Sequence, residues 1–124
     1  MNRDMANWLK VPCDKNTAWV KLKTVVELLC ECIDKNQIQE RQLETFRDSL
    51  MGSLMVEHDK GNPIHLFKGL VNSQGKVEYA VLRKAMDLAG ISEHVMSDTI
   101  KRITVYPNGA FAIEYEGQDT PVWR

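Results

Sequence analysis

Cysteine and histidine side chains are the first candidates for metal or nucleophilic chemistry in this 124-residue sequence. Cys30 and Cys32 are two residues apart in a segment with helical periodicity, so their thiols point roughly 200° apart around the helix axis and cannot hold one ion. The three histidines belong to separate expected elements, and none is four residues from another histidine or from a cysteine. We therefore expect no metal site and no cofactor.

Covalent catalysis would need a nucleophile, a base and an orienting group in one arrangement. Serine, histidine and aspartate all occur, but the sequence contains neither a nucleophile elbow nor a glycine-rich phosphate loop. The glycine-containing stretches at residues 61–63 and 72–75 are typical of turns. The sequence therefore predicts a protein that is not an enzyme.

Residues 77–103 carry the local pattern with the clearest mechanism. Apolar residues recur at helical spacing from Val77 to Leu88, and Gly90 is well placed to end that helix. Ser92 is expected to cap a second helix that runs to about Arg102. Two helices around such a tight turn resemble the helix-turn-helix unit of DNA-binding proteins, although Met86 stands where repressor-type units usually have alanine.

The resemblance implies that the second helix enters the major groove of duplex DNA. Glu93 and Asp98 on the same helix would oppose the approach to phosphates. The polar side chains of Ser92, His94 and Ser97 would then contact base edges. The basic side chains of this region would contact phosphates: Arg83, Lys84, Lys101 and Arg102.

From Thr104 onward the apolar period changes from 3.6 to 2, and Asn108-Gly109 between two β-prone runs predicts a β-hairpin. In a winged version of the helix-turn-helix, this hairpin is the wing and Asn108 at its tip is a DNA-binding residue. Residues 93–116 also resemble the C-terminal segment of large serine recombinases. That second resemblance implies an origin in phages or other mobile elements.

The N-terminal half predicts an antiparallel helical hairpin. One helix is expected over Thr17–Lys35, and a second runs to about Val56 after an Asn36 cap with Gln39 in the capping-box position. The connection would be two or three residues long. The inward stripe of the first helix would contain Trp19, Leu22, Val25, Val26, Leu29, Cys32 and Ile33.

After this hairpin, Asn62 and Pro63 predict the start of a short helix over residues 64–71. The expected fold is α+β and mostly helical, in one domain over residues 1–124. The helical hairpin occupies residues 1–57, the helix-turn-helix with its β-hairpin residues 62–116, and a tail residues 117–124, with Trp123 docked on the body.

The composition is that of one ordinary soluble domain, with 44% apolar residues, 27% charged residues and a formal net charge of −1. No apolar run approaches the roughly 20 residues of a membrane-spanning helix. The N-terminus lacks the apolar segment of a secretion signal, and an odd number of cysteines favours free thiols in a reducing compartment. We therefore expect a cytoplasmic protein without membrane contact.

Charge is unevenly distributed along the chain. Residues 1–59 hold 8 basic and 10 acidic side chains, residues 60–105 hold 7 and 4, and residues 106–124 hold 1 and 3. The positive centre coincides with the helix-turn-helix pattern. Its surplus of three would support only a few phosphate contacts, so DNA binding predicts a homodimer. The helical hairpin is the natural contact element of such a dimer; the alternative is that it only packs on the C-terminal half of the same chain.

Two functions follow from these patterns. The first is a small non-enzymatic DNA-binding or regulatory protein of phage or mobile-element type, with duplex DNA as its partner. The second is a protein-binding module, such as an inhibitor, immunity or adaptor protein, that uses acidic and methionine-rich surfaces against a host protein. Binding that weakens steeply with salt would favour DNA, whereas loss of a protein partner on charge reversal at Glu114 and Glu116 would favour the second.

Overall fold

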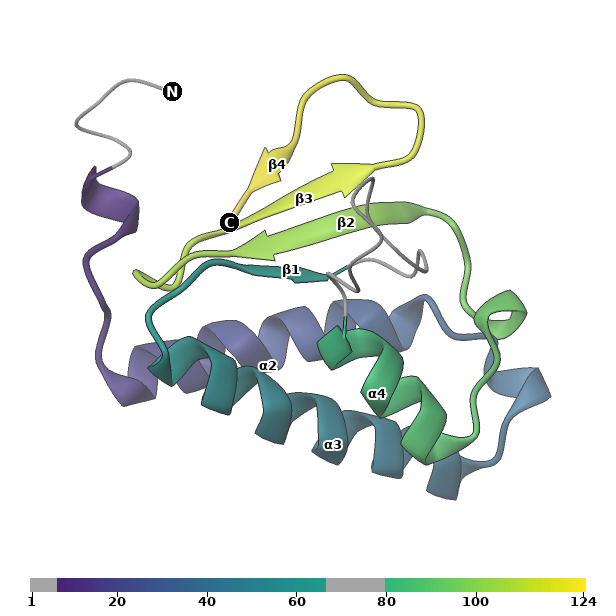
Figure 1. Cartoon of the computed structure of the whole chain (residues 1–124). Helices are drawn as coiled ribbons and strands as arrows, with labels where there is room; N and C mark the ends of the chain where they lie inside the picture. The colour runs from purple at the N-terminus through teal and green to yellow at the C-terminus, as the bar shows by residue number, and fades with distance from the viewer. Residues whose placement is uncertain (1–6, 67–79) are drawn as a thin grey trace.

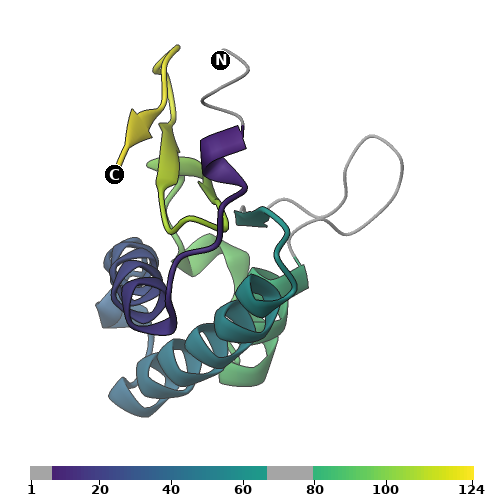
Figure 2. The ribbon, with the colours of Figure 1, turned by 90° about the vertical axis from the view of Figure 1, so that its left-hand side faces the viewer.

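The computed structural model describes residues 7–66 and 80–124, and it places the helices on one side of an antiparallel sheet (Figures 1 and 2). The strand order is β1-β2-β3-β4. This mixed, mostly helical architecture confirms the expected α+β class. In chain order, the main elements are α2 (Lys15–Glu31), α3 (Glu40–Asp59), β1 (Ile64–Leu66), α4 (Ala80–Ala89), β2 (Ile100–Val105), β3 (Phe111–Tyr115) and β4 (Val122–Trp123).

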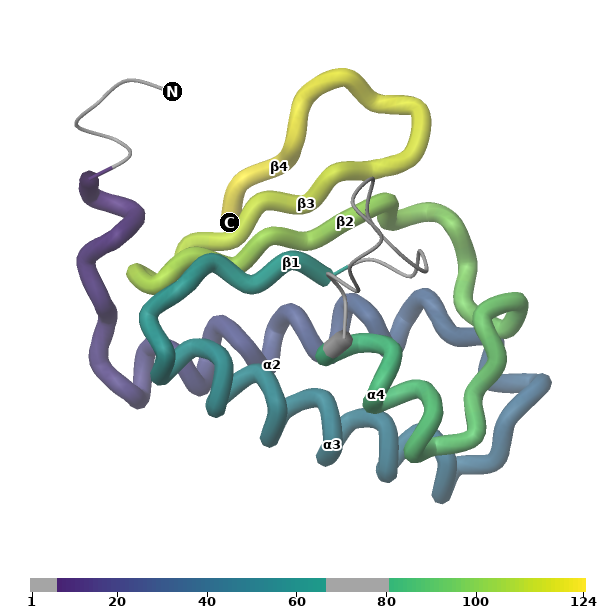
Figure 3. The backbone as a smooth tube through the Cα atoms, viewed as in Figure 1, coloured from purple at the N-terminus to yellow at the C-terminus, as the bar shows by residue number. Residues whose placement is uncertain are grey.

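Helices α2 and α3 form the expected antiparallel hairpin, which the backbone trace shows clearly (Figure 3). The Asp14 side chain caps α2 by accepting a hydrogen bond of 2.7 Å from the Thr17 backbone N–H. The expected Asn36 cap and short connection are wrong. The Asp34 carboxylate accepts from the Asn36 N–H and stabilises a 3₁₀ turn over Lys35–Gln37, so α3 begins later, with Gln39 as its N-cap.

The helix expected over residues 64–71 is also wrong in its described part, because Ile64–Leu66 is strand β1. Ile64 and Leu66 are buried while His65 between them is exposed, which is a strand alternation. Backbone pairing with β2 supplies the hydrogen bonds that a helix would otherwise provide. The rest of that expected helix, the turn at 72–75 and the start of the next helix at 77–79 lie outside the described residues.

Gly90 ends α4 as expected. Its φ of +69° is readily adopted by glycine, and the Ile91 N–H donates to the Met86 carbonyl at 2.9 Å, which closes the helix end.

The second helix of the helix-turn-helix pattern is not formed. After Gly90 the chain makes a short 3₁₀ turn over Glu93–Val95 and then becomes extended, with Met96 in a β-bridge to Ile33 and β2 beginning at Ile100. Ser92 precedes the turn without a side-chain capping bond. The β-branched side chains of Ile100–Val105 favour a strand, and pairing with β1 and β3 stabilises it beyond what an isolated short helix could gain.

The core lies between the helices and the inner face of the sheet. Alternate strand residues point toward the helices, and the helices bury one stripe each. The central fully buried side chains are Leu22, Val25, Phe46, Leu50, Leu54, Leu66, Leu82, Met86, Ile103, Phe111 and Ile113. None of the helices within the described ranges is long and apolar enough to cross a membrane.

Candidate functional site

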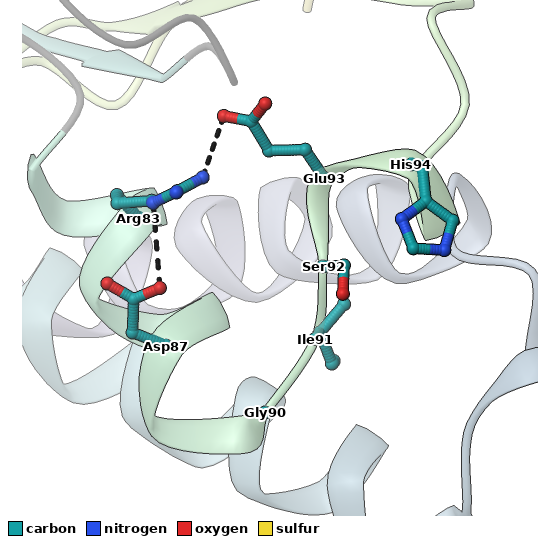
Figure 4. A pocket seen from close by; sticks show the side chains of 7 residues that line it. All are labelled: Arg83, Asp87, Gly90, Ile91, Ser92, Glu93 and His94. Atoms are coloured by element: carbon teal, nitrogen blue, oxygen red, sulfur yellow. Dashed lines mark hydrogen bonds and ion pairs between the residues drawn. The ribbon is translucent and has the colours of Figure 1, made fainter.

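A surface pocket of about 780 Å³ contains three of the residues expected to bind DNA (Figure 4). It lies between α4 and the segment that follows Gly90. The lining residues are Arg83, Asp87, Gly90, Ile91, Ser92, Glu93 and His94.

The charge of this pocket does not suit an anion. Arg83 Nη1 lies 2.7 Å from Glu93 Oε1, and its Nε lies 3.5 Å from Asp87 Oδ1, so two carboxylates face one guanidinium. Ser92 and His94 extend from the opposite side of the connecting segment, away from Arg83 (Figure 4). The pocket therefore offers neither an exposed cation for a phosphate nor a serine–histidine pair arranged around an acid.

The other expected DNA-binding residues are dispersed. Lys84 lies on α4 beside a separate small pocket, and Ser97 lies in the extended segment before β2. Lys101 is exposed on β2. Arg102 donates from Nε to Glu114 Oε2 at 2.6 Å across the β2–β3 pair. The structure therefore does not gather the basic side chains into one surface suited to a groove of DNA.

The expected wing tip faces the interior. The β2–β3 hairpin is present, but its turn is packed against the helices, and Pro107 and Gly109 are buried. The Pro107 carbonyl accepts from the Cys13 N–H at 3.1 Å and from His58 Nε2 at 3.0 Å. Asn108 is half-buried and its Oδ1 accepts from the Ala110 N–H at 2.9 Å, so its predicted contact with DNA stays a prediction with little exposed surface behind it.

Thiol chemistry is disfavoured by burial. Desolvation raises the pKa of Cys30 to about 11 and also raises the pKa of Cys13. All three cysteines are free thiols, and no group of metal-binding side chains is found among residues 7–66 and 80–124. The thiols of Cys13 and Cys30 are therefore protonated near neutral pH and poor nucleophiles.

A second surface, which we call the α2 groove, was not expected from the sequence. It is a hollow of about 430 Å³ between the outer side of α2 and the end of the chain after β4. Its lining residues are Trp19, Val20, Lys23, Thr24, Glu27, Leu28, Glu31 and Arg124.

Trp19 and Val20 form the apolar end of the α2 groove, with 47% and 58% of their surfaces exposed. The expected inward orientation of Trp19 is wrong, because Ala18 occupies the core position on that turn and Trp19 points outward. The Lys23 ammonium lies 4.8 Å from the centre of the Trp19 ring, which holds the indole in place by a cation–π contact. The sequence pattern that could have indicated an outward Trp19 is the spacing of Ala18, Leu22 and Val25, which forms a complete inward stripe without the tryptophan.

The tail residue Trp123 is docked only in part. Strand β4 pairs with β3, and Trp123 stacks on Tyr106 with ring centres 5.5 Å apart. Val122 and Trp123 nevertheless keep 41% and 38% of their surfaces exposed at the sheet edge. The end of the chain thus adds exposed apolar surface at an edge strand whose outer side no other described strand covers.

Comparison with known proteins identified no matching family model, no matching curated protein and no matching solved structure.

Proposed function

We propose that this chain is a non-enzymatic, cytoplasmic protein-binding module, and that the α2 groove is its main contact surface. One observation carries the proposal. The sequence has three tryptophans, and all of them are on the surface, with Trp8 57%, Trp19 47% and Trp123 38% exposed. Tryptophan is highly buried in most folded proteins and is enriched in the energetic centres of protein interfaces.

The distribution of the other aromatic residues strengthens this argument. Phe46 and Phe111 fill the core and are almost completely buried, so the fold does not lack room for aromatic side chains. The exposed apolar residues also concentrate at the described segment before α2 (residues 7–14, which we call the N-terminal arm), the first turns of α2 and strand β4. Exposed apolar surface of this kind is typical of a site that a partner covers.

The contact surface differs from the acidic and methionine-rich one expected from the sequence. Met86 and Met96 are buried in the core, and Glu114 is paired with Arg102. The α2 groove instead combines apolar side chains with both signs of charge at its rim. A cytoplasmic location is supported by the three free thiols.

Binding to duplex DNA stays a prediction, but the helix that was expected to enter the major groove is not formed. The segment after Ser92 is extended, and the guanidinium groups of Arg83 and Arg102 face carboxylates. An extended segment with neutralised arginines gives weaker support to groove binding than the exposed tryptophans give to protein binding.

The test is affinity capture from the cells that naturally make the protein, followed by reconstitution with the purified partner. Trp19→Ala combined with Trp123→Ala should abolish capture. The matched control is Val56→Ala combined with Leu88→Ala, which removes two side chains that are 57% and 61% exposed on α3 and α4. Capture should survive the control, and reconstituted binding should persist at about 0.5 M salt because its centre is apolar. Recovery of nucleic acid alone, or equal loss in both variants, would contradict the proposal.

A further inference from the structure

We propose that the α2 groove takes a second copy of this chain, with the two α2 helices antiparallel across a two-fold axis. This inference rests on the proposed protein-binding role of the groove and adds the identity of the partner.

The outer side of α2 is divided into two unlike halves. The N-terminal half carries the apolar Trp19 and Val20 together with the cation Lys23. The C-terminal half carries Glu27, Leu28 and Glu31. Trp19, Lys23, Glu27 and Glu31 follow one another at steps of four, so they lie along one side of the helix. Leu28 lies at the border of this side and packs partly against the core.

With this order, one α2 helix is complementary in charge to a second α2 helix that runs in the opposite direction. When two α2 helices lie antiparallel, the N-terminal half of each faces the C-terminal half of the other, so Lys23 comes beside Glu27 or Glu31 of the second copy. Trp19 then lies opposite Glu31 of the second copy. Both halves of the contact are equivalent, as a two-fold interface requires. A parallel arrangement would place Lys23 against Lys23 and the carboxylates against each other.

Contacts within the chain already hold two of the charged side chains of this surface in place. The Lys23 ammonium is held over the Trp19 ring, and Glu27 accepts from Arg47 Nε at 2.7 Å, so both side chains are already ordered. Glu31 is exposed at the end of the helix and is available to an incoming cation. An interface centred on one helix side is small, so we expect dissociation in the micromolar range.

Sedimentation velocity of the full chain from about 5 to 500 µM tests the proposal. The mass should rise from 14.2 kDa toward twice that value, 28.4 kDa. Lys23→Glu or Glu31→Lys alone should weaken association by about tenfold or more, because each places like charges together. The double charge exchange, Lys23→Glu with Glu31→Lys, should restore it. Lys84→Glu, which reverses an exposed cation on α4, is the matched control and should have no effect.

The possible failures are distinguishable. A wild-type chain that stays at 14.2 kDa throughout overturns the second copy as occupant. If Trp19→Ala still removes a captured foreign protein in that case, the protein-binding function stands. A dimer that resists both Lys23→Glu and Trp19→Ala also overturns the inference, because its interface must lie elsewhere. Circular dichroism of each variant, compared with the wild-type spectrum, confirms that a lost dimer is not an unfolded chain.

Discussion

At the scale of single residues, Gly109 shows most directly why the hairpin turn faces inward. Its φ is +90°, and a Cβ added there would lie 3.3 Å from Cys13 Sγ and 3.4 Å from Lys21 Cγ. Glycine therefore satisfies two demands at once, a left-handed backbone and a close approach to the start of α2. The turn is a packing element and does not form a free tip.

Gly109→Ala should lower the free energy of unfolding by about 1–3 kcal/mol, because the alanine is strained in this backbone conformation and crowds Cys13. Chemical denaturation followed by circular dichroism measures the change. Gly52→Ala is the matched control. Gly52 lies inside α3 with nothing within 4 Å of an added Cβ, so that substitution should stabilise the protein by about 0.5–1 kcal/mol. Equal effects of the two substitutions would contradict the buried turn.

Cys30 provides a second test at this scale. With its pKa raised to about 11 by burial, roughly one molecule in a thousand carries the thiolate at pH 8, and the side chain is also shielded from reagents. Alkylation followed by mass spectrometry should leave Cys30 unmodified in the folded chain and modify it fully in denaturant. Rapid alkylation of Cys30 under native conditions would show that the core around α2 is open.

At the scale of elements, the sequence patterns predicted well where one period dominates. The α2–α3 hairpin follows from its apolar stripes, the end of α4 follows from Gly90, and the β2–β3 hairpin follows from Asn108-Gly109. These features depend on local spacing and turn chemistry. They needed no knowledge of what lies on the other side of the core.

Prediction was wrong where tertiary contacts outweigh local preference. The segment after Ser92 has helical spacing, but its backbone pairs with Ile33 and then with β1 and β3. Trp19 fits the three- and four-residue spacing of the inward stripe, but Ala18 is the residue that lies against the core. Neither the neighbouring strand nor the space beneath a helix can be read from the segment itself.

The β2–β3 pair carries a pH-dependent contact. The hydrogen bond from Arg102 lowers the pKa of Glu114 below its ordinary value of 4.5. A lowered pKa means that this contribution to stability is present above pH 4.5 and is lost as the pH falls through the lower value of the folded state.

Glu114→Gln should therefore reduce the free energy of unfolding at neutral pH by about 0.2–1 kcal/mol, a small effect because the pair is partly exposed. The difference from the wild type should shrink between about pH 5 and pH 3. Denaturant titrations at several pH values measure it. A difference that grows toward acid pH would contradict the assigned pair.

At the scale of the whole molecule, the aromatic residues are divided between the core and the surface by type. Phe46 and Phe111 fill the interior between helices and sheet, while the tryptophans lie outside on α2, β4 and the N-terminal arm. The arginines nearest the expected DNA-binding region are turned toward carboxylates of the same chain. The surface therefore exposes large apolar side chains, whereas these arginines are paired with carboxylates of the same chain. This difference is the basis of the proposed protein-binding role.

The fluorescence of Trp19 tests this account most directly. In a chain with Trp8→Phe and Trp123→Phe, Trp19 is the only tryptophan, and its emission reports on the α2 groove. Emission should shift to shorter wavelength, and quenching by acrylamide should fall, when the chain is concentrated from about 5 to 500 µM, the range expected for the small proposed dimer interface. The same changes should follow when the captured partner is added. A chain that keeps only Trp8 serves as control and should change less. Emission and quenching of Trp19 that stay those of a water-exposed indole under both conditions would contradict the claim that this groove binds protein.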